Sequence, residues 1–250
     1  TLKAQVEPLL GIVDVVKSVA ENLPAFERDT EYVSLKQDGV YTFYHGDIGS
    51  TDGKVKPVSE WESVANEYVS NQSTAKWAKW NRESYAVGAL ARFNNNAELL
   101  SPLGKKVAEM FGLEKGCCSP FMNNVAQLAE CAHVVEASIG IIDSLLATGV
   151  KPSNVKVNPK AGKGDAAVEA PRGILFHSYE FDKEGICQGG NLCIPTNQNH
   201  ANIQHDFEKF VPEFIDQGED KLRQGLEMLV RAYDPCISCS THYLDVKFVK

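Results

Sequence analysis

The chain has 250 residues, of which 43% are hydrophobic and 23% charged, and its formal net charge is -8 at pH 7. This composition is that of a globular protein with a large core, so it excludes a disordered chain. Because the charge balance is acidic and no cluster of lysine and arginine occurs, nucleic acid is excluded as a partner.

Three features of the sequence bear on the cellular compartment. Seven cysteines, an odd number, occur without a signal-peptide pattern in residues 1–20, which indicates reduced thiols or metal ligands and a cytoplasmic location. The longest apolar run, residues 134–150, contains Glu136 and Asp143, so we expect no membrane span. The first residue is Thr1 rather than methionine, which suggests a processed or partial chain.

The first third of the chain predicts one helix followed by a small sheet. Apolar residues at three- and four-residue steps predict an amphipathic helix over residues 2–23, ended by Pro24. Residues 32–44 are β-branched and aromatic around an Asp-Gly turn, and a second Asp-Gly turn at 52–53 extends the predicted antiparallel sheet. A serine followed by acidic residues then predicts a helix over residues 59–69.

The middle of the chain is dominated by one long helical pattern. Residues 85–95 are rich in glycine and alanine, which is typical of a close-packed loop or a helix start. Apolar spacing over residues 119–148 predicts the central helix of a bundle. On it, His133 and Glu136 lie three residues apart, and without a matching pair elsewhere a satisfied polar contact is favoured over a metal site. Residues 150–167 are the most loop-like stretch of the chain.

A hairpin follows, and its ends carry chemically informative residues. Residues 173–194 contain two strand patterns around an Asp-Lys-Glu-Gly turn. Pro171 and Arg172 precede the first strand, and Pro195 and Thr196 follow the second. Because these ends of an antiparallel pair lie side by side, a guanidinium and a hydroxyl would meet over one site.

Two final helices, predicted over residues 201–214 and 220–233, lead to a thiol-containing segment. Its residues are Asp234, Pro235, Cys236, Ile237, Ser238, Cys239, Ser240, Thr241 and His242. Two thiols three residues apart can converge on one soft metal ion from a single turn. Two ligands do not complete a tetrahedral site, so the others must come from Cys187 or Cys193, from a histidine, or from another polypeptide.

The Asp-Pro-Cys-x-x-Cys-x-x-His pattern at 234–242, with Glu-Ala-Pro-Arg-Gly at 169–173, resembles the large subunit of nickel-iron hydrogenases. Residues 85–95 resemble a segment of its cytoplasmic carrier-coupled group, which includes F420-reducing, F420-nonreducing and NAD-linked enzymes. The elements and the resemblance together predict a mainly α (α+β) fold, a helical bundle core with small antiparallel hairpins. Residues 1–250 would form a single domain, the C-terminal portion of such a subunit.

The resemblance implies reversible heterolytic cleavage of dihydrogen at a thiolate-bridged nickel-iron centre whose iron carries cyanide and carbonyl ligands. Cys236 would be a terminal nickel ligand and proton acceptor, and Cys239 would bridge nickel and iron. His242 would bind a third metal, magnesium or iron, together with the backbone carbonyl of Leu192.

The resemblance also implies a role for the arginine. Arg172 would pair with Asp234, hold the anionic ligands and polarise the cavity, because a guanidinium does not lose its proton. The pockets for the diatomic ligands would be lined by Pro171, Arg172, Pro195 and Thr196.

Two departures from the family pattern and the implied partners complete the expectations. The family's first cysteine pair is absent from this sequence, so it would lie in a longer form of the chain or on a separate polypeptide. The tail of residues 243–250 suggests an unprocessed precursor or a member that keeps a short tail. An iron-sulfur small subunit would take the electrons, and a flavin, F420, NAD or heterodisulfide-reductase type subunit would carry them on.

Three other interpretations stay open. Cys236, Cys239 and His242 with one more ligand would make a structural zinc site, which has no need of Arg172. A relative from a respiratory complex would keep the fold as a scaffold without the metal site. A thioredoxin-like redox pair would need a strand-to-helix context, which a segment after a helix does not offer.

Overall fold

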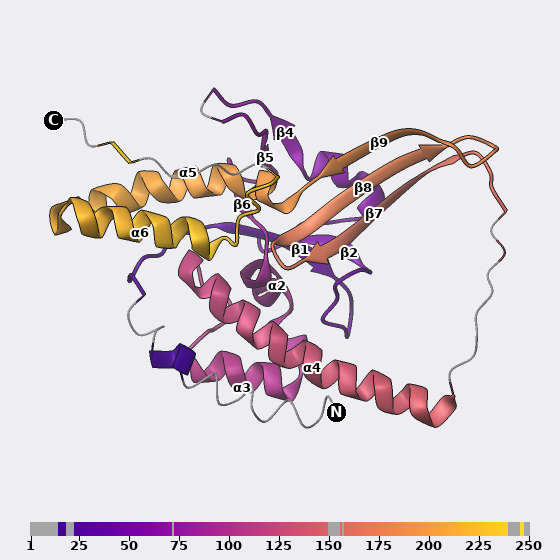
Figure 1. Ribbon diagram of the computed structural model, residues 1–250, viewed down its shortest axis with the longest axis horizontal. Coiled ribbons are helices and arrows are strands. Elements are labelled where there is room, and N and C mark those ends of the chain that lie inside the picture. Colours follow the sequence, from indigo (N-terminus) through magenta and orange to yellow (C-terminus); the bar gives the residue numbers. More distant parts are fainter. Residues whose placement is uncertain are drawn as a thin grey trace.

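A computed structural model describes residues 15–18, 23–71, 73–149, 156, 158–239 and 246–247. Figure 1 shows helices and small sheets side by side, in agreement with the expected α+β class. The elements, with η for 3-10 helices, are β1 (Glu31–Lys36), β2 (Asp47–Ser50), β3 (Val55–Lys56), η1 (Val58–Ser63), β4 (Asn66–Tyr68), β5 (Trp77–Lys79), β6 (Tyr85–Ala86), α2 (Ala89–Asn96), η2 (Ala97–Leu99), α3 (Pro102–Met110), η3 (Pro120–Met122), α4 (Asn123–Thr148), β7 (Gly162–Ala170), β8 (Gly173–Phe181), β9 (Cys187–Cys193), α5 (Pro195–Phe214), η4 (Ile215–Gln217) and α6 (Glu219–Ala232).

The N-terminal expectations are confirmed in part. The helix predicted over residues 2–23 lies largely outside the described residues. Within that range, residues 15–18 are described and are helical. The small sheet is present, in the order β3-β2-β1-β6, with β6 parallel to β1 and the other pairs antiparallel. The strand that pairs with β1 begins at Asp47, however, and only the bridge between Gln37 and Val40 closes the first Asp-Gly turn.

The helix predicted over residues 59–69 is wrong. The chain forms the 3-10 helix η1 and then β4, which pairs with β5. Trp61 and Val64 are 1% and 0% exposed, and the Trp61 ring stacks on Phe176 of β8 at 5.3 Å between centroids. Burial of these two side chains and the pairing of β4 outweigh the helical preference of the local sequence.

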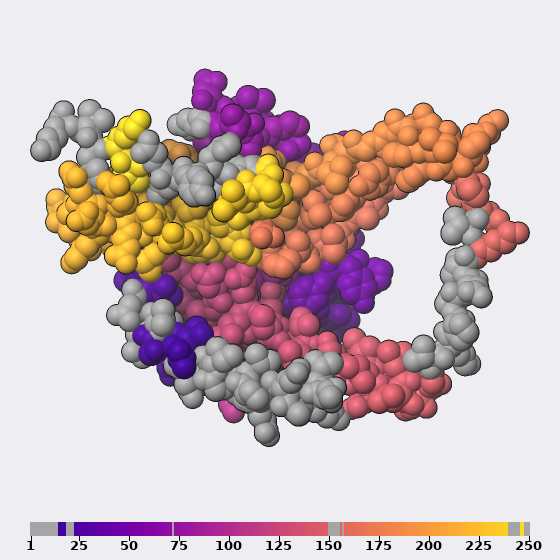
Figure 2. All heavy atoms as spheres, in the orientation of Figure 1, coloured from indigo at the N-terminus to yellow at the C-terminus, as the bar shows by residue number. Residues whose placement is uncertain are grey.

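The sheet that contains the predicted hairpin of residues 173–194 has three strands instead of two, in the order β7-β8-β9. All nine residues of β7 pair with β8, from Gly162 opposite Phe181 to Ala170 opposite Gly173, and β9 pairs on the other side of β8. The loop predicted over residues 150–167 is therefore wrong from Gly162 onward, because cross-strand pairing organises residues whose own composition is typical of a loop. Figure 2 shows this sheet extending outward from the body of the protein.

Helix α4 is the longest helix, as predicted, but it is not central along its whole length. All of its buried side chains belong to its first eight residues, whereas exposed apolar residues follow from Val134 onward: Val134, Ile141, Ile142, Leu145 and Leu146. The helical segment Pro120–Thr148 is long and apolar enough to cross a membrane by length and composition alone, and 22% of its apolar stretch is buried inside the protein. The expectation that the chain has no membrane span therefore does not follow from hydropathy alone. The first half nevertheless belongs to the protein body, because Glu130 is ion-paired with Arg92 in the core.

The pair on α4, His133 and Glu136, makes the satisfied polar contact that was favoured. His133 Nδ1 accepts a hydrogen bond from the backbone N–H of Ser101 at 3.0 Å, and Glu136 accepts one from Leu103 at 3.0 Å. These N–H groups stand at the start of α3, where no intrahelical acceptor exists. The two side chains therefore dock α3 onto α4.

Lowering the pH should weaken this docking through His133. Burial lowers the pKa of His133 below its ordinary value, against the opposing effect of Glu130 and Glu136. A lowered folded-state pKa means that the stabilisation is present above about pH 6.5 and is lost as the pH falls through the folded pKa. Urea unfolding at about pH 7.5 should show His133→Leu less stable than the parent by about 1 kcal/mol, the net value of one hydrogen bond. At about pH 5 the difference should shrink; an equal difference at both pH values would contradict the assignment.

The last two helices are confirmed, with one change in extent. Helix α6 buries Leu222, Leu226 and Leu229, as its spacing predicts. Helix α5 begins six residues earlier than predicted, at Pro195, because amide side chains in its first turns are buried and hydrogen-bonded. Gln198 donates to the carbonyl of Ile174 in β8, at 2.7 Å. The polar first turn of α5 is thus an interior element that joins the helix to the sheet.

Candidate functional site

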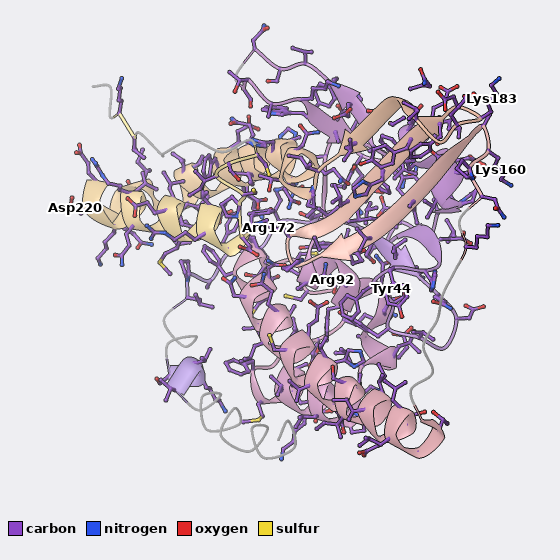
Figure 3. All side chains as sticks on the ribbon, turned by 45° about the vertical axis from the view of Figure 1, so that its right-hand side comes forward. Tyr44, Arg92, Lys160, Arg172, Lys183 and Asp220 are labelled. Atoms are coloured by element: carbon purple, nitrogen blue, oxygen red, sulfur yellow. The ribbon has the colours of Figure 1, made fainter. Side chains whose placement is uncertain are left out.

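Three segments distant in sequence carry the predicted site residues. The turn between β7 and β8 carries Pro171 and Arg172, and the first turn of α5 carries Pro195 and Thr196. The segment after α6 carries the two thiols. Figure 3 shows Arg172 at the base of the β7–β9 sheet, close to the end of α6, with Lys183 at the far tip of the sheet.

Two contacts join these segments. Arg172 Nε lies 3.8 Å from Asp234 Oδ1, and this buried Nε has no hydrogen-bond partner among the residues that the structure describes. The backbone N–H of Cys236 donates to the hydroxyl of Thr196 at 3.1 Å. The guanidinium and the hydroxyl therefore both reach the segment that carries the thiols. Because both side chains are partly exposed, the Arg172 contact contributes little stability by itself.

The two thiols form a compact turn. The backbone N–H of Cys239 donates to the carbonyl of Cys236 at 3.1 Å, and the Cys236 sulfur lies 3.4 Å from the Ser238 hydroxyl. The hydrogen bond from the Cys239 thiol lowers the pKa of Cys236, helped by Ser238 and Arg172, and the same bond raises the pKa of Cys239. Cys236 is thus the first of the two to become a thiolate, the form that binds metals.

This donor set fits half of a soft-metal site. Two adjacent sulfurs suit nickel, iron or zinc, whereas the residues that the structure describes contain no group of three histidine, cysteine or carboxylate side chains placed to hold a metal. His242 lies outside the described residues. Leu192 is the penultimate residue of β9, opposite His177 and three residues before Pro195.

The two cysteines considered as further ligands are not placed for that role. Cys193 is 1% exposed, and burial raises the pKa of its thiol to about 12, so it stays protonated. Cys187 pairs with Phe181 at the far end of the sheet, where its sulfur contacts the carbonyl of Gly189 at 3.4 Å. Neither thiol belongs to a group of three metal-ligating side chains among the described residues, so the remaining ligands of the proposed site must come from elsewhere.

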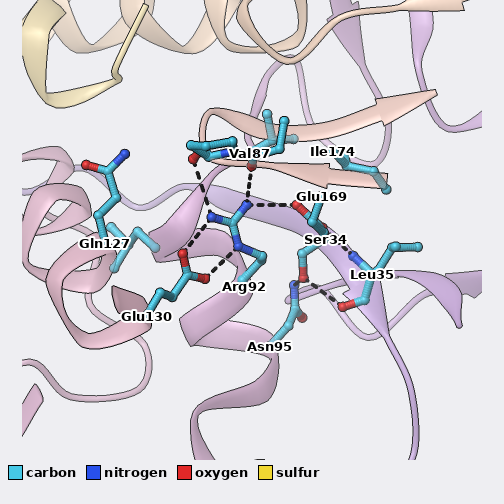
Figure 4. Close-up of polar contacts among 12 residues, drawn as sticks. Ser34, Leu35, Val87, Arg92, Asn95, Gln127, Glu130, Glu169 and Ile174 are labelled. Atoms are coloured by element: carbon cyan, nitrogen blue, oxygen red, sulfur yellow. Dashed lines mark hydrogen bonds and ion pairs between the residues drawn. The ribbon is translucent and has the colours of Figure 1, made fainter. Parts of the chain in front are cut away.

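A buried ion network that sequence reasoning missed supports the arginine turn. Arg92 of α2 donates to both carboxylate oxygens of Glu130, at 2.6 and 2.7 Å, and to Glu169 of β7 at 2.9 Å (Figure 4). It also donates to the carbonyls of Ala170 and Pro171, at 2.9 and 3.3 Å. A charged residue within the glycine- and alanine-rich stretch 85–95 was the signal that could have revealed it.

The charged groups of this network are all hydrogen-bonded, with one guanidinium shared between two carboxylates. Burial alone would lower the pKa of Arg92, but the carboxylates of Glu130 and Glu169 raise it above its ordinary value. The second oxygen of Glu169 accepts the backbone N–H of Leu35 at 2.7 Å, and the Tyr41 hydroxyl donates to Glu130 at 2.7 Å. With every charged group bonded, the network holds the carbonyls that precede Arg172 in a fixed place.

Gly173, the residue after Arg172, allows the turn to approach α2 closely. Its φ is +132°, and a Cβ there would overlap the Val87 side chain and lie 2.9 Å from the backbone nitrogen of Gly88. Gly173→Ala should therefore lower the free energy of unfolding by about 1–3 kcal/mol, through strain and displacement of the turn. The matched control is Gly189→Ala in β9, where nothing lies within 4 Å of the added carbon. Equal urea midpoints for the two variants would refute the close approach.

A comparison with protein families supports what the site residues indicate. A family model described as nickel-dependent hydrogenase matches residues 21–242. The alpha subunit of sulfhydrogenase 1 from Pyrococcus furiosus is 31% identical over 247 residues, 96% of this chain and 57% of the relative. One subunit of the F420-non-reducing hydrogenase from Methanothermobacter thermautotrophicus is 28% identical, over 87% of this chain and 49% of the relative. The beta subunit of the NAD-reducing hydrogenase HoxS from Cupriavidus necator is 29% identical, over 81% and 45%.

The solved structures that resemble the chain have the same fold. An NAD+-reducing NiFe hydrogenase in the H2-reduced state superposes with a TM-score of 0.75 at 22% identity, over 96% of this chain and 58% of that chain. The NiFeSe hydrogenase of Dm. baculatum superposes with a TM-score of 0.58 at 17% identity. The chain spans about half the length of the curated relatives it matches.

Proposed function

Because the chain belongs to the nickel-dependent hydrogenase family, we propose that it is the C-terminal part of a large subunit. It would supply two thiolates and an arginine to a nickel-iron centre at which dihydrogen is cleaved reversibly and heterolytically. The observation that carries this proposal is the meeting of Arg172, Thr196 and Cys236 at one place, from three separate segments. A structural zinc site would require the thiols but not the guanidinium.

The chain's own residues divide the chemistry among them. A bound nickel-iron centre, with cyanide and carbonyl on iron, supplies the polarisation that splits dihydrogen. Cys236 and Cys239 would hold the centre through their sulfurs, and the Cys236 sulfur, with its lowered pKa, would also be able to hold the released proton. Arg172 offers anionic ligands a guanidinium whose Nε has no hydrogen-bond partner within the described part of the chain, with Asp234 orienting it.

Further contributions to the site follow from the same proposal. Pro171, Pro195 and Thr196 line the pockets for the diatomic ligands. His242 and the carbonyl of Leu192 bind a third metal, magnesium or iron.

The proposal requires partners. Two more thiolates must arrive from a segment outside these 250 residues, on this polypeptide or on another. The names of the relatives designate parts of larger complexes, which supports a small subunit with iron-sulfur clusters and a further subunit for the electron carrier. One of these relatives reduces NAD, a soluble carrier, which supports a cytoplasmic location.

Elemental analysis of the purified complex that contains this chain, combined with infrared spectroscopy, tests the proposal. We expect nickel together with iron in excess over nickel, because the clusters of the small subunit add iron, and infrared bands in the cyanide and carbonyl stretching region. Zinc alone, without such bands, would leave the structural zinc site as the function of the two thiols. No bound metal at all would favour the scaffold relative without a metal site.

A further inference from the structure

Gln127, in the first half of α4, holds the carboxylate of Asp234. Its Nε2 donates to Asp234 Oδ2 at 3.1 Å, and Asn124 Nδ2 donates to Gln127 Oε1 at 3.0 Å. Because a carboxylate accepts hydrogen bonds, the NH2 end of Gln127 faces Asp234, and the Gln127 oxygen accepts from Asn124. The amide of Gln127 is thus oriented by its own helix before it meets Asp234.

The backbone of Asp234 makes this support necessary. Its φ is +50°, a conformation that no other non-glycine residue among the described residues adopts. Residues with side chains visit this region rarely, so the surrounding contacts must hold the conformation in place. Its backbone N–H donates to the carbonyl of Arg231 at 2.9 Å. With Oδ2 occupied by Gln127, the other oxygen, Oδ1, faces Arg172.

A second residue on the same helix holds the other partner of the pair. Glu130 lies about one turn beyond Gln127 and binds Arg92, which in turn holds the carbonyls of Ala170 and Pro171. Figure 4 shows Gln127 and Glu130 projecting from one helix beside Arg92. Side chains of helix α4 therefore hold both members of the ion pair: Glu130 acts through Arg92 on the turn that carries Arg172, and Gln127 binds the carboxylate of Asp234.

We propose that Gln127 is a positioning residue: by binding Asp234 Oδ2 it aims Oδ1 at Arg172 and so fixes the guanidinium beside the thiols. The consequence for hydrogen cleavage rests on the proposed function. A displaced guanidinium would no longer meet the reacting groups in the required geometry, and a misplacement of about 1 Å can cost up to about a hundredfold in rate.

Gln127→Glu is the sharp test, because it keeps the size of the side chain and replaces the donor by a second carboxylate. Repulsion should turn Asp234 away from its present orientation and release Arg172. The first readout is the rate at which phenylglyoxal modifies Arg172 in the full chain, followed by mass spectrometry. We expect a several-fold faster modification than in the parent. Gln127→Met removes the donor without adding charge and should act in the same direction, but less.

The matched control is Gln204→Glu on α5. Gln204 Nε2 also donates to a carboxylate, Glu208 Oε1, at 3.1 Å, but on the exposed surface. This variant places the same repulsion away from the thiols, so the modification rate of Arg172 should remain that of the parent. An unchanged rate in both Gln127 variants, or an equal increase in the control, would overturn the positioning role.

The complete complex provides the second readout. With nickel and iron content unchanged, Gln127→Glu should shift the cyanide bands and lower kcat about tenfold, with KM for dihydrogen nearly constant. Unchanged bands and kcat would refute the role in the reaction, whatever the modification rate. If the parent complex contained no nickel and showed no cyanide or carbonyl bands, the proposed function would be refuted instead. The phenylglyoxal modification rates would then decide by themselves whether Gln127 holds Asp234 against Arg172.

Discussion

Cys236→Ser should abolish nickel retention and reduce hydrogen activity of the complex by more than about a hundredfold. Loss of a residue that only supports a metal ligand already costs up to about a hundredfold, and here the ligand itself is lost. A serine hydroxyl neither ionises near neutral pH nor matches the softness of the metal. Nickel content by elemental analysis and hydrogen uptake with an artificial electron acceptor measure the two effects.

Cys131→Ser is the control for this prediction. Cys131 is an exposed cysteine on α4, and its substitution should leave nickel content and activity at the parent level. If the Cys236 variant kept its full nickel content, Cys236 would not be a nickel ligand. A loss of nickel in the Cys131 variant as well would point to a general effect of thiol removal on the fold.

Arg92→Met should lower the free energy of unfolding by about 3–5 kcal/mol. The Arg92 side chain is 2% exposed, and its removal takes away the cation that is ion-paired with both Glu130 and Glu169 in the core. The methionine restores most of the packing but none of the five donors. Urea unfolding of the full chain measures the loss.

Arg82→Met provides the matched comparison. Arg82 also binds two carboxylates, those of Asp29 and Asp52, but its side chain is 37% exposed. Water solvates those carboxylates when the arginine is removed, so the loss should stay below about 1 kcal/mol. Similar losses in the Arg82 and Arg92 variants would show that burial does not amplify the effect. Arg92→Lys should recover part of the stability, since it restores the charge without the forked geometry.

Local patterns predicted part of the fold, and long-range pairing decided the rest. The helical stripe of α6, the long period of α4 and the turn between β8 and β9 were all predicted, because each is encoded within a few consecutive turns or strands. Strand β7 and the first turn of α5 were missed. Their compositions are typical of loops. Strand β7 is formed by its pairing with β8, and the first turn of α5 by the burial of amide side chains such as Gln198.

By itself, the sequence determined the chemistry that is available: two thiols at a spacing that suits a soft metal, an arginine after a proline, and a chain large enough to bury them around one site. Only the tertiary structure decided which distant residues support these groups. Arg92 lies 78 residues before Ala170 and Gln127 lies 107 residues before Asp234, and no local periodicity relates either pair. Such contacts become favourable only when folding has excluded water from around them, so a linear pattern does not reveal them.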